Sequence, residues 1–193
     1  TVLAALDRAI AASADPAAAA PEAATANRLL MGVPGVLALL DRREFATELA
    51  ARLDRLDGAV AAFDAELEAA ELDPDEVERR GAASIALRDQ LWAIRHDRLR
   101  TADAVAALAG RDARRGAVAG YLAVQQALSA IDRLEVRGRD SAGINVFVHD
   151  HGLDLADPAV AAAIDARDDD PMYQSGSVRA AGAVVSFTYK AAA

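Results

Sequence analysis

A chain of 193 residues is long enough for one domain with an appendage, and its formal net charge of −9 argues against the clustered basic surface that nucleic-acid binding requires. The absence of cysteine excludes disulfides and thiolate metal sites within the chain. The sequence has no basic-then-apolar leader and no charge-free run of the roughly 18 to 20 residues that cross a bilayer, so we expect a cytoplasmic protein without a membrane segment.

Short helices are predicted at the start of the chain. Leu3, Leu6 and Ile10 share one face of a helix over residues 2–12, and the alanine- and proline-rich residues 13–21 are expected to break it. A second helix is predicted over 23–30, followed by a stop at 31–35 and a short helical stretch at 36–40. The Gly-Val-Pro-Gly run at 32–35 has neither the lysine nor the preceding strand of a phosphate-binding P-loop, so that function is not expected.

Apolar residues then repeat at alternating spacings of four and three, which is the pattern of a heptad seam. The seam consists of Phe45, Leu49, Leu53, Leu56, Val60, Phe63, Leu67 and Ala70. A new helix is predicted to start where Asp73 can act as N-cap, with Pro74 at the first helical position and Glu76 completing a capping box.

This second helix repeats the apolar spacing to about residue 100, with Val77, Ser84, Leu87, Leu91 and Ile94 on one stripe. The two long helices are therefore expected to fold back as an antiparallel coiled-coil hairpin over residues 44–100. Thr101 and Asp103 are predicted to cap another short helix, and residues 114–133 form one more.

The pattern changes after the last of these helices. Residues 144–149 alternate and are rich in β-branched and aromatic side chains, which predicts a strand. A short helix is expected from Asp157 and Pro158 to Ala166, and at least one further strand over 183–189.

The most informative stretch joins the helix to the first strand and reads Arg-Leu-Glu-Val-Arg-Gly-Arg-Asp-Ser-Ala-Gly-Ile over 133–144. It resembles the Arg-Leu-Glu-Tyr-Arg-Gly-Tyr-Asp-Ser-Ala-Gly signature of the glucosamine-6-phosphate synthase family, whose glutaminase domain is a class II, N-terminal-nucleophile amidotransferase. The sequence departs from that signature at Val136 and Arg139, where the family usually has tyrosines. The resemblance covers roughly residues 116–193.

The resemblance implies that Arg137, Gly138, Asp140, Ser141 and Gly143 form the supporting shell of a glutaminase pocket. Glycines permit backbone angles that a β-carbon disfavours, and the aspartate and serine side chains can bond nearby backbone amides and hold the turn rigid. A well-formed helix-to-strand turn with no direct chemistry is the open alternative for each residue.

In the family the nucleophile is an N-terminal cysteine whose own α-amino group is the base. This chain has no cysteine, and Thr1 opens directly into a predicted helix, so we expect the nucleophile strand to lie upstream of Thr1 and the chain as given to be inactive. The resemblance implies a parent glutamine–fructose-6-phosphate aminotransferase that takes glutamine and a sugar phosphate as substrates, needs no cofactor and forms a homo-oligomer.

Two weaker patterns have residue types that can bind metals. His149, Asp150 and His151 with Asp154 fit a solvated turn better than a metal cluster, and the acidic run at 168–170 lacks the glycine and distal glutamate of a calcium loop. No metal is expected. Trp92, with His96 one turn later, is expected to pack at a helix interface, with contact to a partner as the alternative.

Together these patterns predict an α+β protein that is mostly helical, with part of an amidotransferase sheet toward its C-terminal end. Residues 1–115 are expected to be a helical insertion that contains the long hairpin, and residues 116–193 a partial glutaminase domain. The alternative function is a non-catalytic interaction or regulatory module, in which the heptad seam mediates self-association.

Overall fold

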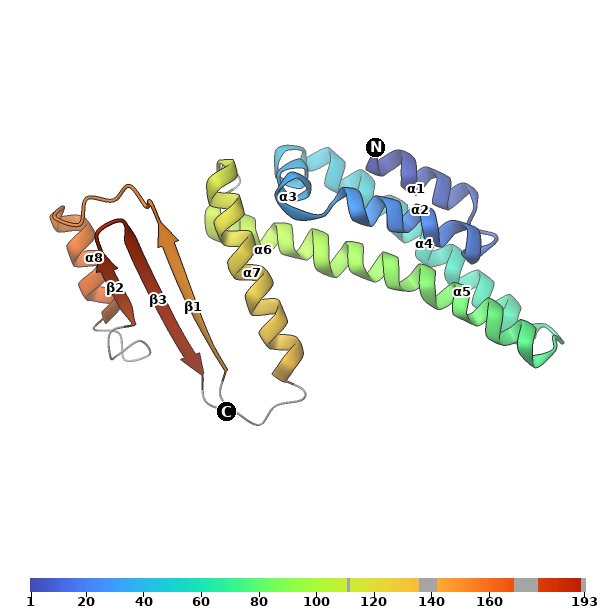
Figure 1. Ribbon diagram of the computed structural model, residues 1–193. Helices are drawn as coiled ribbons and strands as arrows, with labels where there is room; N and C mark the ends of the chain where they lie inside the picture. Colours follow the sequence, from blue (N-terminus) through green and yellow to red (C-terminus); the bar gives the residue numbers. More distant parts are fainter. Residues whose placement is uncertain (111, 136–141, 169–176, 192–193) are drawn as a thin grey trace. The chain divides into compact units, whose positions relative to one another are not determined.

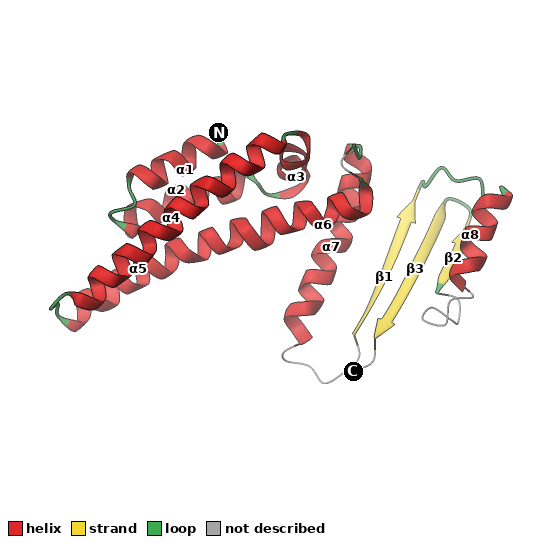
Figure 2. Ribbon diagram, turned by 180° about the vertical axis from the view of Figure 1, so that it is seen from behind, coloured by secondary structure: helices red, strands yellow, loops and turns green. Residues whose placement is uncertain are grey.

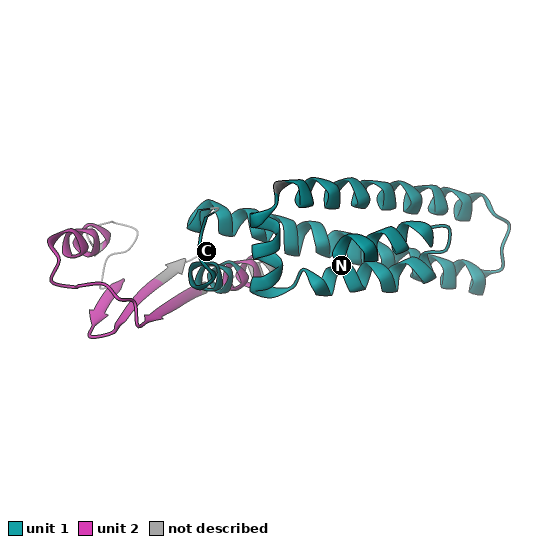
Figure 3. Ribbon diagram, turned by 90° about the horizontal axis from the view of Figure 1, so that it is seen from above, with its two compact units in different colours: residues 1–125 teal, residues 126–193 magenta. Residues whose placement is uncertain are grey.

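The computed structural model describes residues 1–110, 112–135, 142–168 and 177–191, and it divides into two compact units, Thr1–Gln125 and Gln126–Ala193 (Figure 3). The described strands, yellow in Figure 2, all fall within the residues of the second unit, whereas the first unit is helical. The protein is therefore mostly helical with a small antiparallel sheet, and the predicted α+β class is confirmed.

The first unit begins with three helices, α1 (Val2–Ala11), α2 (Pro16–Leu29) and α3 (Gly32–Asp41). The predicted break over residues 13–21 is shorter than expected, because α2 already starts at Pro16 and continues through Pro21. The Asp15 side chain accepts a hydrogen bond from the Ala17 amide at 3.0 Å and so caps the helix, with Pro16 at its first position. This start signal outweighs the helix-breaking tendency of Pro21.

The two long arms of the expected hairpin are α4 (Arg43–Ala69) and α5 (Pro74–Ala93). The Asp73 side chain caps α5 by accepting a hydrogen bond from the Glu76 amide at 3.0 Å. Heptad residues from both arms are buried, namely Leu49, Leu53, Leu56, Val60, Phe63, Ser84, Leu87, Leu91 and Ile94, whereas Val77 near the hairpin tip is 41% exposed.

The hairpin of α4 and α5 packs against the two N-terminal helices. Figure 1 shows α1 and α2 laid along α4 and α5; α1 packs against α2 and α4, and α2 packs against α5 (Figure 1). Ala5, Leu6, Ala9, Ala19, Ala23 and Ala26 join the buried cluster from the two shorter helices. The abundant alanine allows these helices to approach closely, so the seam is covered within the chain as part of a four-helix arrangement.

The helix that starts at α5 continues without a break through η1 (Ile94–Leu99), which has π-helical hydrogen bonding, into α6 (Arg100–Ala109). Thr101 and Asp103 therefore lie inside a helix, and the predicted helix start at these residues is wrong. The helix ends at Gly110, whose φ of +81° suits a glycine terminator. Among the described residues no single helix is long and apolar enough to cross a bilayer. Helices α2 and α3 together have the length and composition to do so, but they are bent by 86° relative to each other.

The division between the two units falls within α7 (Arg115–Glu135). Val118 and Leu122, near the start of this helix, are buried in the core cluster of the first unit. The last ten residues of α7 belong to the second unit, so the chain has no loop at the boundary between its compact parts.

The second unit also contains β1 (Ala142–His149), α8 (Pro158–Asp168), β2 (Val178–Ala181) and β3 (Val184–Ala191). The strands form one antiparallel sheet in the order β1-β3-β2. Gly182, at a φ of +57°, lies in the tight turn that joins β2 to β3. Both predicted strands are present, and β2 is an additional short one.

Candidate functional site

The segment that carries the family resemblance is flanked by two described elements. Helix α7 ends at Glu135 and strand β1 begins at Ala142. Arg137, Gly138, Asp140 and Ser141 lie outside the described residues. Gly143, the fifth predicted pocket residue, is exposed in β1 and pairs with Lys190 of β3. The structure thus places the elements on either side of the signature and leaves its pocket role as a prediction.

The sheet that follows the signature has one apolar face. In an antiparallel sheet, directly paired residues point to the same side, so Val146, Phe187 and Val178 form a row across the three strands. Helix α8 packs against β2, and a cavity of about 490 Å³ remains beside it. Its lining is Leu153, Ala159, Val160, Ala163, Ile164, Arg167, Val178, Val185 and Phe187. The cavity is lined mainly by apolar side chains, and its lining contains no arrangement of groups that suggests catalysis.

The histidines and aspartates at the far end of β1 hold a turn that leads to α8. The Asp150 amide donates to the Ala183 carbonyl at 2.8 Å, and the Leu153 amide donates to Nδ1 of His151 at 3.0 Å. The Asp154 side chain accepts from the Ala156 amide at 2.9 Å. Within the described part of the chain, no group of three or more potential ligands is arranged to hold a metal ion.

Thr1 caps the helix that it was predicted to open. Its Oγ1 accepts a hydrogen bond from the Ala4 amide at 3.3 Å at the start of α1. A hydroxyl group in this position satisfies one of the unpaired amides at a helix N-terminus, which is a structural role.

A polar network around the π-helical segment was not predicted from the sequence. Arg98 in η1 donates from Nε to Oδ1 of Asn27 in α2 at 2.8 Å, and Nδ2 of Asn27 donates to Oε1 of Gln90 in α5 at 3.0 Å. Arg95, also in η1, donates to the carboxylates of two residues on α4, Asp54 at 2.8 Å and Asp57 at 2.5 Å. The pKa of Arg95 is raised although burial lowers it, because the hydrogen bonds to the two carboxylates outweigh the loss of solvation.

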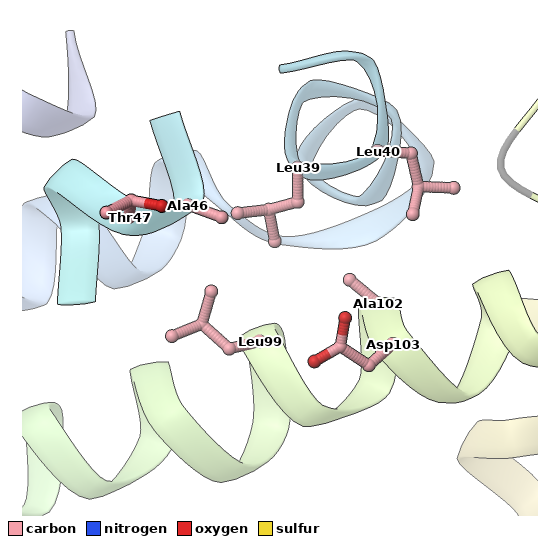
Figure 4. Close-up of a pocket in the computed structure, with 7 residues that line it drawn as sticks. All are labelled: Leu39, Leu40, Ala46, Thr47, Leu99, Ala102 and Asp103. Carbon is pink, nitrogen blue, oxygen red and sulfur yellow. The ribbon is translucent and has the colours of Figure 1, made fainter. Parts of the chain in front are cut away.

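A groove next to η1 was also missed. It measures about 330 Å³ and is lined by residues of α3, α4, η1 and α6, namely Leu39, Leu40, Ala46, Thr47, Leu99, Ala102 and Asp103 (Figure 4). Leu39, Leu40 and Ala102 are buried, whereas Thr47 and Asp103 are exposed. No sequence signal marks this groove, because its residues are spread over 65 positions and each fits an ordinary amphipathic helix.

The single tryptophan lies on the outer side of α5. Trp92 is 50% exposed and stacks on His96, with ring centroids 4.5 Å apart and planes inclined by 12°. Nδ1 of His96 lies 3.1 Å from the Trp92 carbonyl, where an N–H can donate to it. Trp92, which was expected to pack at a helix interface, is thus half exposed, and its ring stacks on a residue of the same continuous helix.

Surface ion pairs tie the bundle helices together. Arg52 of α4 bonds Asp7 of α1 at 2.8 Å, and its hydrogen bond and positive charge lower the pKa of that carboxyl despite the opposing effect of burial. Arg8 lowers the pKa of Glu22 in the same way, between α1 and α2. These pairs are exposed, so each contributes little to stability.

In the comparisons with known proteins, no family model, no curated protein and no solved structure matches this chain. The family proposal therefore depends on the signature between Glu135 and Gly143.

Proposed function

We propose that this chain is part of a cytoplasmic glutamine amidotransferase that supplies ammonia for glucosamine-6-phosphate synthesis from fructose-6-phosphate. The observation that supports the proposal is the setting of the signature, which connects the end of α7 to the first strand of an antiparallel sheet. A helix before the signature and a strand after it are what the sequence resemblance implies.

The proposed chemistry needs a cysteine supplied upstream of Thr1. Its thiolate attacks the side-chain amide carbon of glutamine, the C–N bond breaks, and ammonia leaves with the proton that the α-amino group took from the thiol. Water then hydrolyses the thioester, which gives glutamate and restores the thiol. The ammonia passes to the sugar phosphate bound by a separate part of the parent protein.

In this proposal the residues of the signature position the glutamine. Arg137 and Asp140 are expected to orient the substrate or the strand that carries the nucleophile, and Gly138 and Gly143 allow the backbone to turn there. Holding the reacting atoms in place is the main contribution that such a wall can make to the rate.

The experiment is a glutaminase assay on the full protein that the gene encodes, including any residues that precede Thr1. Glutamate release is expected to disappear when the proposed upstream cysteine is replaced by alanine. Asp140→Ala is expected to lower kcat/KM by roughly tenfold to a hundredfold because the substrate loses its alignment.

Asp154→Ala is the matched control, since Asp154 caps a turn at the other end of β1. It is expected to leave the rate unchanged. Release of glutamate that persists at the normal rate without the cysteine would contradict the mechanism, and a full-length protein that encodes no cysteine before residue 1 would remove its basis.

A second candidate function is that of an interaction module, and the exposed outer face of α5 favours it. Ile85 is 58% exposed and Trp92 50% exposed, and residues seven apart lie on the same side of an α-helix. Exposed aromatic residues of this kind are common anchors of protein interfaces. The heptad seam itself is buried within the chain, so self-association through the seam would require the bundle to open.

Sedimentation equilibrium tests this second function. If α5 mediates self-association, the protein is dimeric or larger and Trp92→Glu makes it monomeric, because a charge cannot be buried in an apolar contact without a partner. Val77→Glu, at an exposed apolar position on another side of α5, is the control. A monomer at every concentration tested would eliminate self-association through this face.

A further inference from the structure

We propose that the outer edge of strand β1 is an interface to which a second copy of this chain adds its own β1 in antiparallel orientation, so that two three-stranded sheets join into one. The interface lies wholly within the second compact unit. The proposal does not depend on the glutaminase function, and it concerns a different surface from the outer face of α5. Figure 1 shows β1 at one side of the sheet, with β3 between it and β2.

The hydrogen bonds of the sheet show which backbone groups of β1 lie on this edge. The Asp150 amide donates to the Ala183 carbonyl at 2.8 Å, just beyond the last residue pair of β1 and β3. The Thr188 amide donates to the Ser177 carbonyl at 2.7 Å, between β3 and β2. Successive residues of an antiparallel strand direct their backbone groups alternately to the two sides. Both bonds therefore give the same result, that the even-numbered residues of β1 bond β3.

The odd-numbered residues of β1 consequently direct their N–H and C=O groups away from β3. These residues are Gly143, Asn145, Phe147 and His149, and all four are exposed. Among the described strands only β3 pairs with β1, so within this part of the chain the outward groups have no strand partner. A row of unpaired backbone donors and acceptors is a template for another strand.

The two edges of the sheet differ in the features that normally prevent such pairing. The β2 edge has only four residues, carries Arg179 and has α8 packed against it. Strand β1 has eight residues and contains no lysine, arginine, aspartate, glutamate or proline. Short length, charged side chains and a covering helix keep edge strands apart, and β1 has none of the first two. Phe147, 58% exposed, and Val148, 39% exposed, add apolar surface at this edge.

The pairing pattern of β1 is complementary to itself. Two copies of one strand that pair antiparallel about a two-fold axis bring residues of the same sheet face opposite each other. With the axis at Val146, Asn145 lies opposite Phe147 of the second copy, and Gly143 lies opposite His149 of the second copy. All four outward residues are then paired, which gives about eight backbone hydrogen bonds. Any other axis position leaves at least one of them outside the paired strands.

The apolar face of the sheet continues across the dimer in this register. Val146 shares that face with Phe187 and Val178, and Ile144 and Val148 point to the same side of β1. In the dimer Val146 lies beside its own copy, and Ile144 lies beside Val148 of the second copy. Pairs of β-branched residues stabilise neighbouring strands, and no like charges are opposed. This match in hydrogen bonding, charge and apolar surface favours a second copy over an unrelated strand.

Cysteine crosslinking of the full 193-residue chain tests the register, since the chain contains no cysteine of its own. Val146→Cys is expected to form a disulfide-linked dimer on mild oxidation, because the Cα atoms of a pair without mutual hydrogen bonds lie about 4.5 Å apart. Ile144→Cys and Val148→Cys should each remain uncrosslinked when oxidised separately. A mixture of these two variants should crosslink.

Sedimentation equilibrium tests the edge in the cysteine-free chain, for which we expect a reversible dimer. Phe147→Pro removes one outward N–H and leaves the hydrogen bonds to β3 in place, so it should weaken the dimer at least about tenfold. Phe147→Ala is the matched control because it keeps the N–H, and it should dimerise within about threefold of the wild type. Trp92→Glu, on the outer face of α5, should leave this dimer unchanged.

Several results would overturn the proposal. They are a monomer at every concentration, a dimer that Phe147→Pro does not weaken, and crosslinking of Ile144→Cys or Val148→Cys alone that equals crosslinking of the mixture. The crosslinking comparison remains decisive if Phe147→Pro does not fold. Slow hydrogen exchange at the amides of Asn145 and Phe147 in a monomer would show that another segment of the same chain covers the edge, and would equally refute the proposal.

Discussion

Among the described glycines, Gly35 is the one where an added β-carbon would clash with backbone, and we expect Gly35→Ala to destabilise the protein strongly. A β-carbon at this position would lie 1.9 Å from the Leu30 carbonyl oxygen and 2.3 Å from its carbon. The Leu30 backbone would have to retreat by about 1.5 Å to reach ordinary contact distance, and as the C-terminal cap of α2 it cannot rotate away as a side chain can.

The size of the effect follows from two opposing terms. Overpacking typically costs about 1 to 3 kcal/mol, and a clash with backbone belongs at the upper end of that range, while the higher helix propensity of alanine returns about 1 kcal/mol. The net loss in the free energy of unfolding is therefore about 2 kcal/mol, which lowers the melting temperature by roughly 4 to 8 °C for a body of this size. Urea denaturation followed by far-ultraviolet circular dichroism measures it.

Two other helical glycines serve as controls of opposite sign. Gly58 in α4 and Gly81 in α5 have nothing within 4 Å of the position of a β-carbon. Alanine at either site is expected to stabilise the protein by about 0.5 to 1 kcal/mol, since the helix becomes easier to form. If Gly35→Ala were as stable as the wild type, the close approach of α2 and α3 would not exist as described.

Two further predictions concern the bundle. Leu53→Ala should lower the free energy of unfolding by about 2 to 5 kcal/mol because Leu53 is fully buried. Val77→Ala, at the exposed hairpin tip, should lower it by less than about 1 kcal/mol. Similar losses for both variants would contradict the burial of the heptad seam. Arg52 holds the pKa of Asp7 below its ordinary 3.8, so the pair stabilises the fold above that pH and ceases to do so as the pH falls toward the lower folded value. Asp7→Asn should therefore show a shallower loss of stability in acid at low salt, and identical acid profiles would contradict this sign.

The parts of the fold that could be predicted are those that local pattern determines. The heptad spacing predicted both arms of the hairpin, and the capping signal at Asp73 located the start of α5. The composition change predicted the strands β1 and β3. In each case the side-chain period or cap chemistry acts over a few neighbouring residues.

Other features depend on contacts that are distant in sequence. Within the π-helical segment, Arg95 bonds Asp54 on α4 and Arg98 bonds Asn27 on α2, and no periodicity in the sequence reveals these distant partners. The alanine- and proline-rich residues 13–21 predicted a break, whereas α2 starts at Pro16 with Asp15 as its N-cap. The resemblance of residues 133–144 to a glutaminase signature rests on residue types alone, and four of the five predicted pocket residues lie outside the described part, so their roles remain predictions.

The passage of α7 from one compact unit into the other has a practical consequence for dissecting the protein. A polypeptide cut at residue 115, where the sequence suggests a boundary, would lose Val118 and Leu122 and leave the apolar surface beneath them open to water. Such a fragment should be prone to aggregate. One that extends to residue 135 keeps this cover, so the helical portion is best produced with the whole of α7 attached.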